Sequence, residues 1–196
     1  EVLNIDEKSG LAWHVLALCQ EKSGHLAQAL SAYEAALALM PDENNIAHDL
    51  SRLAQRLGQL EIAEKLLRKF LAVEPGHIDA TNNLACVLRD ANRYEEAVEV
   101  LRDMIQVEPG SALLWNTLGT VQSDQGDMAT ALTFFEEALR LDPDWVKPRL
   151  NLGVELARSG RHEAALVAYA QVISRAPKHR SVHYNRGRVL VRMGRL

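Results

Sequence analysis

Five prolines recur along this chain at a constant interval: Pro41, Pro75, Pro109, Pro143 and Pro177, whose numbers increase by 34 each time. Proline has no amide hydrogen and disfavours α geometry in the residue before it, so each proline predicts the end of a helix. A constant period in the range of about 20 to 50 residues is typical of stacked supersecondary units. The period therefore predicts a chain built from one repeated unit, without a single central core.

Within each period, small and apolar residues recur at helical spacing. A small residue lies twelve positions before each proline, and a large apolar or aromatic residue follows it four positions later, as in Ala131 and Phe135. Spacings of three and four place side chains on one helical face, and an earlier leucine column marks a second such face in every period. Each period therefore predicts two helices. Small residues after that leucine column, such as Gly119 and Gly153, predict a close approach of the paired helix.

A third column separates the two helical faces. It consists of glycine in every period except one, where asparagine replaces it: Gly24, Gly58, Asn92, Gly126, Gly160 and Gly194. A residue just past a helix often adopts positive φ, which glycine accepts most readily and asparagine next. The unit predicted from these columns is a helix, a tight turn, a second helix and a proline stop.

This pattern resembles that of the tetratricopeptide repeat (TPR) family, whose motif W-x2-L-G-x2-Y, A-x3-F and P recurs with the same period. The fourth period matches it at Trp115, Leu118, Gly119, Ala131, Phe135 and Pro143. The resemblance implies an all-α fold, a right-handed α-solenoid of tandem helix-turn-helix units. We expect one solenoid over residues 1–196, with full repeats at 10–43, 44–77, 78–111, 112–145 and 146–179. Residues 1–8 are expected to end a preceding repeat, and 180–196 to form the first helix of a truncated sixth.

Composition and cysteine positions limit the setting of the protein. Aromatic residues make up 5% of a chain that is 47% hydrophobic, which is typical of alanine and leucine packed between close helices. Cys19 and Cys86 lie two repeats apart, beyond the ~7 Å that a disulfide allows between Cα atoms. We therefore expect reduced cysteines and a cytoplasmic location. The sequence has no apolar run long enough to predict a transmembrane helix, so no membrane partner is expected.

No catalytic motif is found in the sequence. It contains no glycine-rich phosphate loop, no HExxH, no CxxC and no serine in a nucleophile-elbow pattern. We therefore predict that this chain is not an enzyme, and we assign no catalytic residue, no cofactor and no metal. His179 and His183 are four positions apart, but we interpret them as surface side chains and not as ligands.

The resemblance implies that the first helices of the repeats line a concave groove that contacts a peptide. Amide side chains both donate and accept hydrogen bonds, which suits a peptide backbone. The exposed columns hold such side chains and a histidine, at Asn82, Asn83, Asn116, Asn151, Asn185 and His48. The run partly resembles the asparagine ladder in the TPR region of O-linked GlcNAc transferase, although Asp49 and Thr117 interrupt it. In an alternative interpretation these side chains are solvated or bridge neighbouring helices.

Charge is unevenly distributed. The chain has a net charge of −4, yet residues 175–196 contain seven arginines or lysines and no acidic residue. The predicted groove includes four arginines: Arg52, Arg89, Arg158 and Arg188. Arg158, Arg188 and the nearby Arg192 together predict attraction for an acidic peptide or a phosphate. The alternative is that the basic excess only reflects the absence of an acidic second helix. We do not expect nucleic-acid binding, because basic surface and stacking aromatics are too few.

These observations predict a non-catalytic scaffold that binds an extended or helical segment of a partner protein in its groove. The Lys, Asn, Asn, Lys, Arg set with which some members of the family grip the C-terminus of chaperones is absent. One alternative is a substrate-recruiting arm of a larger enzyme, such as a glycosyltransferase. Another is a self-associating module that forms a homo-oligomer, because Val182, Leu190 and Met193 on the last helix are expected to be exposed.

Overall fold

The computed structural model describes residues 9–195, apart from the side chain of Asn44. Within these residues the chain forms eleven α-helices and no strand. The prediction of an all-α fold of tandem helix pairs is confirmed. The chain divides into two compact units, residues 1–93 and 94–196, which are described separately, and a single solenoid over the whole chain stays a prediction. Residues 1–8, predicted to end a preceding repeat, lie outside the described residues.

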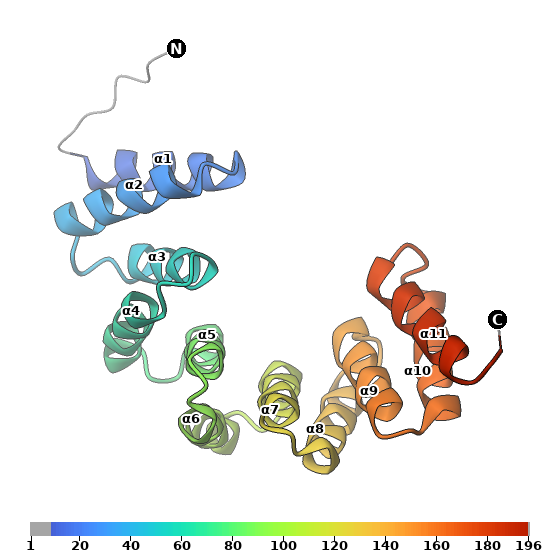
Figure 1. The fold of residues 1–196 in the computed structure, drawn as a ribbon. Coiled ribbons are helices and arrows are strands. Elements are labelled where there is room, and N and C mark those ends of the chain that lie inside the picture. Colours follow the sequence, from blue (N-terminus) through green and yellow to red (C-terminus); the bar gives the residue numbers. More distant parts are fainter. Residues whose placement is uncertain (1–8, 196) are drawn as a thin grey trace. The chain divides into compact units, whose positions relative to one another are not determined.

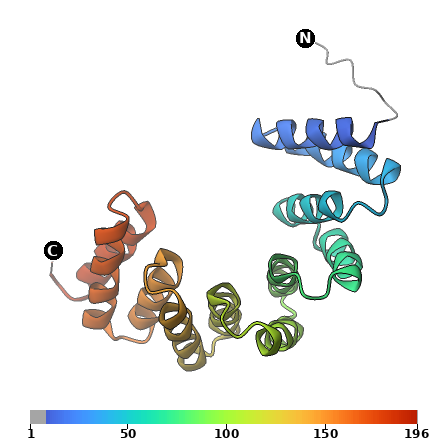
Figure 2. The ribbon, with the colours of Figure 1, turned by 180° about the vertical axis from the view of Figure 1, so that it is seen from behind.

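Unit 1 comprises residues 1–93, and its described part, residues 9–93, forms five helices (Figure 1). They are α1 (Gly10–Lys22), α2 (Leu26–Leu39), α3 (Asn44–Arg56), α4 (Leu60–Val73) and α5 (Ile78–Asp90). α1 packs against α2 and α3 against α4 as helical hairpins, and each hairpin contacts the helix that follows it (Figures 1 and 2). Tyr33 and Leu53 are fully buried among alanines and leucines of α1, α2 and α3, so the core lies between neighbouring helices.

Unit 2 comprises residues 94–196, and residues 94–195 form six helices. They are α6 (Tyr94–Val107), α7 (Ala112–Gln125), α8 (Met128–Leu141), α9 (Val146–Arg158), α10 (His162–Arg175) and α11 (Arg180–Arg192). Tyr169, Val172 and Val189 are buried where α9, α10 and α11 meet. The expectation that Val182 is exposed is wrong, because it is fully buried in this same cluster; Leu190 and Met193 are partly buried.

The predicted turn column is confirmed by the backbone. All six of its residues have positive φ: Gly24, Gly58, Asn92, Gly126, Gly160 and Gly194. Gly126, at φ 96°, ends α7, and its amide donates to the carbonyl groups of Gln122 and Ser123. Among the described residues Asn92, at φ 59°, is the one residue other than glycine with positive φ. Asparagine tolerates this geometry, so the turn after α5 keeps the same form.

The predicted close approach at Gly119 and Gly153 is also confirmed. A Cβ atom added at Gly119 would lie 2.7 Å from Cε1 of Phe135 on α8, and one at Gly153 would lie 2.6 Å from Cε1 of Tyr169 on α10. In both hairpins the aromatic ring of the second helix therefore rests directly on the backbone of the first. In the second case this places the tyrosine where it reaches a pocket between α9 and α11.

Candidate interaction surface

In unit 1, side chains of the first helices are joined from one helix to the next. The Nε2 atom of His14 on α1 lies 3.0 Å from Oδ2 of Asp49 on α3. The Nδ2 atom of Asn83 on α5 lies 3.1 Å from Nε2 of His48 on α3. Each pair spans 35 residues, one period plus one position. For His48 and Asn83, the structure therefore shows the bridging arrangement that was the alternative interpretation.

Glu21, near the end of α1, is a largely buried acceptor that sequence analysis missed. Its side chain is 9% exposed. Arg52 donates to both carboxylate oxygens, with distances of 3.0 and 3.2 Å, and Arg56 donates at 2.5 Å. The hydroxyl of Tyr33 on α2 donates to Oε2 at 3.1 Å. One carboxylate thus links α1, α2 and α3, and we call this group the Glu21 cluster.

The Tyr33 hydroxyl remains a donor to Glu21 at neutral pH. Burial raises its pKa above the ordinary value for tyrosine, and the negative charges of Asp49 and Glu21 raise the pKa further. Arg52 opposes this effect. Because the phenol stays protonated, the Glu21 cluster has a neutral donor and two cationic donors around one carboxylate.

His48 lies in a half-buried aromatic environment. Its ring centroid is 5.8 Å from that of Phe70 and 5.8 Å from that of His77. Because the amide nitrogen of Asn83 donates, its contact with Nε2 favours the neutral imidazole of His48 as the acceptor. Burial lowers the pKa of His48; Asp49 opposes the shift, and His77 adds to it.

This environment predicts a pH-dependent stability. The pKa of His48 is lower in the folded chain than in the unfolded chain, so the unfolded state takes up the proton first as pH falls. The stabilisation is complete above the unfolded pKa of about 6.5 and is lost as pH falls below it. We expect His48→Gln to reduce the fall in melting temperature between about pH 7.5 and pH 5. Thermal melts monitored by circular dichroism test this, and parallel profiles for the two proteins would contradict it.

In unit 2, an amide pair joins α7 and α9. Nδ2 of Asn151 donates to Oδ1 of Asn116 at 3.1 Å, again across 35 residues. Asn116 is 1% exposed, and its own amide nitrogen is buried without a hydrogen-bond partner. Asn116 therefore holds Asn151 in place from beneath, while Asn151 is partly exposed on the surface.

A second polar group joins the same two helices near their C-terminal ends. Oε1 of the buried Glu155 accepts from the Ser123 hydroxyl at 2.7 Å and from Nη1 of Arg158 at 2.9 Å. Nη1 of Arg158 also lies 3.1 Å from the serine oxygen. The predicted groove residue Arg158 is thus held in position on an exposed surface by a buried carboxylate.

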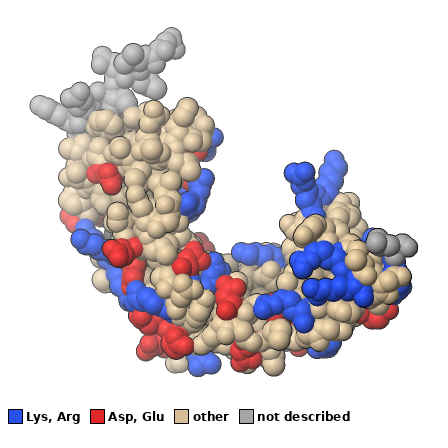
Figure 3. Space-filling view, in the orientation of Figure 1, with Lys and Arg blue, Asp and Glu red and all other residues tan. Residues whose placement is uncertain are grey.

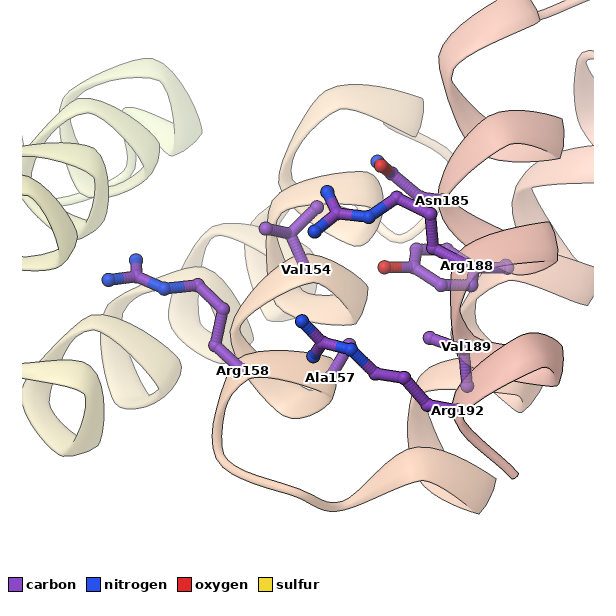
Figure 4. Close-up of a pocket in the computed structure, with 8 residues that line it drawn as sticks. Val154, Ala157, Arg158, Asn185, Arg188, Val189 and Arg192 are labelled. Atoms are coloured by element: carbon purple, nitrogen blue, oxygen red, sulfur yellow. The ribbon is translucent and has the colours of Figure 1, made fainter. Parts of the chain in front are cut away.

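A small pocket lies between α9, α10 and α11. Its volume is about 70 Å³, and it is lined by Val154, Ala157, Arg158, Tyr169, Asn185, Arg188, Val189 and Arg192. Figure 4 shows Arg188 and Arg192 extending from α11 toward α9, while Arg158 extends from α9 away from α11. Asn185 and Arg188 were predicted groove residues, and the structure brings them together on one side of this pocket.

The surface around this pocket is basic. Figure 3 shows Lys and Arg atoms gathered over α9 and α11, with few Asp or Glu atoms among them. Some of the basic side chains of this region are paired: Arg175 with Asp144 at 3.0 Å and Arg195 with Glu163 at 2.6 Å. Arg188 and Arg192 have no ion pair within residues 9–195. The charges of these two arginines are therefore uncompensated, whereas Arg158 is paired with Glu155.

The remaining predicted groove residues lie on α5. Asn82 is partly exposed on this helix. Arg89, near its C-terminal end, donates to Oδ1 of Asp90 at 2.7 Å, and Gln55 on α3 donates to the other carboxylate oxygen at 2.9 Å. Arg89 thus belongs to a polar link between α3 and α5.

No group of three or more His, Cys, Asp or Glu side chains between residues 9 and 195 is placed to hold a metal ion. Nε2 of His183 contacts the carbonyl oxygen of Pro177 at 2.7 Å, so this nitrogen is already engaged. The described part of the chain also has no helix that combines the length and the apolar character needed to cross a membrane.

Comparison with known families decides the relationship. Residues 13–129 match the family model for the middle TPR-like domain of cilia and flagella-associated protein 70, and residues 150–196 match the tetratricopeptide repeat model. The chain belongs to the TPR family. The resemblance predicted from the constant period is confirmed. TPR proteins in general are protein-interaction scaffolds, which gives the broad class of function for this chain.

A relative of known sequence is protein FlbA from Caulobacter vibrioides. It is 54% identical over 65 residues, which cover 33% of this chain. The match spans 11% of the length of FlbA, so this relative is a much longer protein.

Solved structures share the fold. A thermophilic TPR protein from Thermus thermophilus, TTC0263, has a TM-score of 0.80 at 24% identity, covering 93% of this chain and 100% of that one. PilF from Pseudomonas aeruginosa has a TM-score of 0.74 at 22% identity, covering 95% and 85%. MamA from Desulfovibrio magneticus has a TM-score of 0.70 at 19% identity, covering 89% and 97%. At these identities the likeness is one of fold alone.

Proposed function

We propose that this TPR chain is a non-catalytic interaction module that holds a segment of a partner protein against the first helices of its repeats. The observation that carries the proposal is the ordered polar surface of these helices. In unit 2, Asn151 is fixed by Asn116 and Arg158 by Glu155, yet both remain available to a ligand. Side chains that are ordered before binding reduce the entropy lost when a partner binds.

The hydrogen-bonding capacity left on this surface suits a peptide backbone. Asn151 uses its amide nitrogen on Asn116, which leaves its carbonyl oxygen to accept from a ligand. Asn83 has the same arrangement with His48. Asn185 has no hydrogen-bond partner among the described residues, so both ends of its amide are open. We propose Asn82 and Arg89 as further contacts on α5, and Arg52 as one on α3.

Site-specific crosslinking tests which face binds the partner. Tyr184 on the first helix α11 is 67% exposed, and Val167 on the second helix α10 is 59% exposed. We would place the photoreactive residue p-benzoylphenylalanine at each position in turn and irradiate the protein in extracts of its host. We expect a discrete adduct from position 184 that identifies the partner. Position 167 is the matched control and should give none.

The crosslinking result can either support or contradict the proposed binding face. A discrete adduct from position 167 with none from position 184 would contradict the proposed binding face. In unit 1 the same comparison uses Val15 on α1, which is exposed, against Val73 on α4, which is comparably accessible. A partner held along the first helices should react at position 15 and leave position 73 unmodified.

We also propose a reducing compartment, such as the cytoplasm, for this interaction. Cys19 is exposed, and no disulfide joins it to Cys86. An exposed thiol persists unpaired where the thiol pool keeps cysteines reduced. Quantitative thiol labelling of protein isolated without reductant tests this proposal, with two reactive thiols expected for each chain.

A second candidate function is a recruiting arm within a larger protein, such as a glycosyltransferase that binds its substrates through TPR units. The observation that favours it is the relative FlbA, of which the matched region is 11%. The two candidates differ in what flanks the repeats. Translation of the coding sequence on both sides of this region would show a catalytic domain if the second candidate is correct.

A further inference from the structure

The pocket in unit 2 repeats most of the Glu21 cluster of unit 1. Three of its side chains lie four periods after the three donors that hold the Glu21 carboxylate. The corresponding pairs are Tyr33 with Tyr169, Arg52 with Arg188, and Arg56 with Arg192. Because tandem repeats place equivalent positions in equivalent surroundings, the same three donors converge in both units.

These donors occur together at no intermediate repeat. The three positions between Tyr33 and Tyr169 in the same column are Leu67, Leu101 and Phe135, none of which has a hydroxyl group. The positions between Arg52 and Arg188 are Cys86, Thr120 and Val154. The tyrosine therefore appears only where the next first helix carries arginine in this column, in unit 1 and again in unit 2.

The acidic members of the cluster are missing in unit 2. The position equivalent to Glu21 is Ala157, which lines the pocket. The position equivalent to Asp49, whose Oδ1 lies 3.6 Å from Nη2 of Arg52, is Asn185. Unit 2 therefore has the three donors of the cluster and neither of its carboxylates.

Tyr169, Arg188 and Arg192 have no acceptor in the described chain that takes the place of these carboxylates. Tyr169 is 1% exposed and lines the pocket, and its hydroxyl has no hydrogen-bond partner within residues 9–195. The guanidinium group of Arg188 lies 5.8 Å from the ring centroid of Tyr184, and neither it nor Arg192 has an ion pair in that range. The Tyr169 hydroxyl is a donor on the pocket wall, so an acceptor that enters the pocket can bind it together with the two arginines.

Glu155 does not take the place of the missing carboxylate. Its Oε1 atom accepts from Ser123 and Arg158, on the side of α9 that faces α7. Its Oε2 atom is buried without any partner, so it does not accept from the tyrosine. Burial raises the pKa of Tyr169 to about 12, and the hydroxyl is therefore a protonated donor at neutral pH.

The size of the pocket fits one functional group. A volume of about 70 Å³ exceeds the ~10–15 Å³ needed for one water and is well below the ~300–1,000 Å³ of pockets for whole small molecules. A carboxylate at the end of a flexible side chain can therefore enter while the chain that bears it stays outside.

We propose that this pocket binds the carboxylate of a glutamate side chain from an acidic segment of the partner protein, in the place that Glu21 fills in unit 1. The proposal rests on the proposed function as an interaction module. Tyr169, Arg188 and Arg192 donate to the carboxylate, and the basic surface of α11 attracts the acidic segment.

The first test restores the missing carboxylate and needs no partner. Ala157→Glu rebuilds the Glu21 cluster in unit 2, whereas Ala157→Gln has nearly the same shape and no charge. We expect the glutamate variant to melt at a higher temperature than the glutamine variant at neutral pH. A glutamate variant that melts at the same or a lower temperature would overturn the assignment of the pocket. That failure would leave the crosslinking test of the first-helix face unaffected.

The second test measures binding by isothermal titration calorimetry. The probe is an acetylated and amidated peptide with alternating glutamate and serine residues, compared with its glutamine counterpart. We expect the glutamate peptide to bind, and Arg188→Ala with Arg192→Ala to weaken it about tenfold or more. Ala157→Glu should block it by occupying the pocket. Arg195→Ala, which removes an arginine already paired with Glu163, is the control and should have little effect.

Two further probes separate a glutamate side chain from other anions. The glutamine peptide with a free C-terminus presents only a terminal carboxylate, and inorganic phosphate presents a different anion. Equal binding of either one, with the same dependence on Arg188 and Arg192, would overturn the assignment to glutamate. Undiminished binding of the glutamate peptide by the double variant would overturn the pocket itself.

Discussion

Replacing Gly119 by alanine should destabilise unit 2 by about 1–3 kcal/mol, because the added methyl group has no room. Its Cβ would lie 2.7 Å from Cε1 and 2.8 Å from Cδ1 of Phe135. This ring is almost fully buried between the helices and cannot move aside without displacing α8 from α7. Urea unfolding followed by circular dichroism measures the change in free energy.

The chain offers a matched control in Gly187. It occupies the same column two periods later, on α11, but apart from its chain neighbours and the backbone of its own helix no described atom lies within 4 Å of a Cβ added there. Alanine in a helix loses less backbone entropy than glycine, so Gly187→Ala should stabilise by about 0.5–1 kcal/mol. Equal effects of the two substitutions would show that Phe135 does not rest on the backbone of α7.

Removal of the Glu21 carboxylate should have the largest effect of any single polar substitution in unit 1. In Glu21→Ala the buried hydroxyl of Tyr33 loses its acceptor, Arg56 loses its ion pair, and Arg52 keeps only Asp49 at 3.6 Å. Breaking a buried pair costs roughly 3–5 kcal/mol, but both arginines are partly exposed, so we expect about 2–3 kcal/mol. Urea unfolding measures the loss.

A surface ion pair provides the comparison. Glu163 pairs with Arg195 at 2.6 Å, but its side chain is 72% exposed. Water and salt screen such a pair, so Glu163→Ala should change the free energy of unfolding by no more than about 0.5 kcal/mol. Losses of similar size in the two variants would mean that burial of the Glu21 carboxylate contributes nothing to stability.

The helices of this protein could be predicted from its sequence because their signals are local. The constant period, the turn column and the proline column together locate the ends of each helix. Asn92 illustrates the precision of this prediction: its place among glycines predicted a positive φ, and its φ is 59°. Gly119 and Gly153 predicted close packing because a missing Cβ has few other uses inside a helix.

The surface could be predicted only in part, because its contacts join different repeats. Asn116 and Asn151 were predicted as neighbours in one groove, yet the first is 1% exposed and supports the second. This arrangement depends on an offset of 35 residues between bonded side chains, which the packing of helices determines. Val182 was predicted to be exposed because the sequence does not indicate which face of α11 packs against α9 and α10.

Glu21 was missed because a single acidic residue at the end of a helix usually lies in solvent. The signal that could have revealed it was the recurrence of Tyr33 as Tyr169, each followed by arginine on the next first helix. Two tyrosines in a column of leucine and phenylalanine indicate a use for the hydroxyl group. In unit 1 that use is visible as the bond to Glu21.

The proposal that the first helices form the binding surface is tested most directly by hydrogen–deuterium exchange. The protein would be compared alone and with the partner segment identified by the Tyr184 adduct. We expect slower exchange in peptides from α7, α9 and α11, with no change in α8 and α10. Slower exchange confined to α8 and α10 would contradict the proposal.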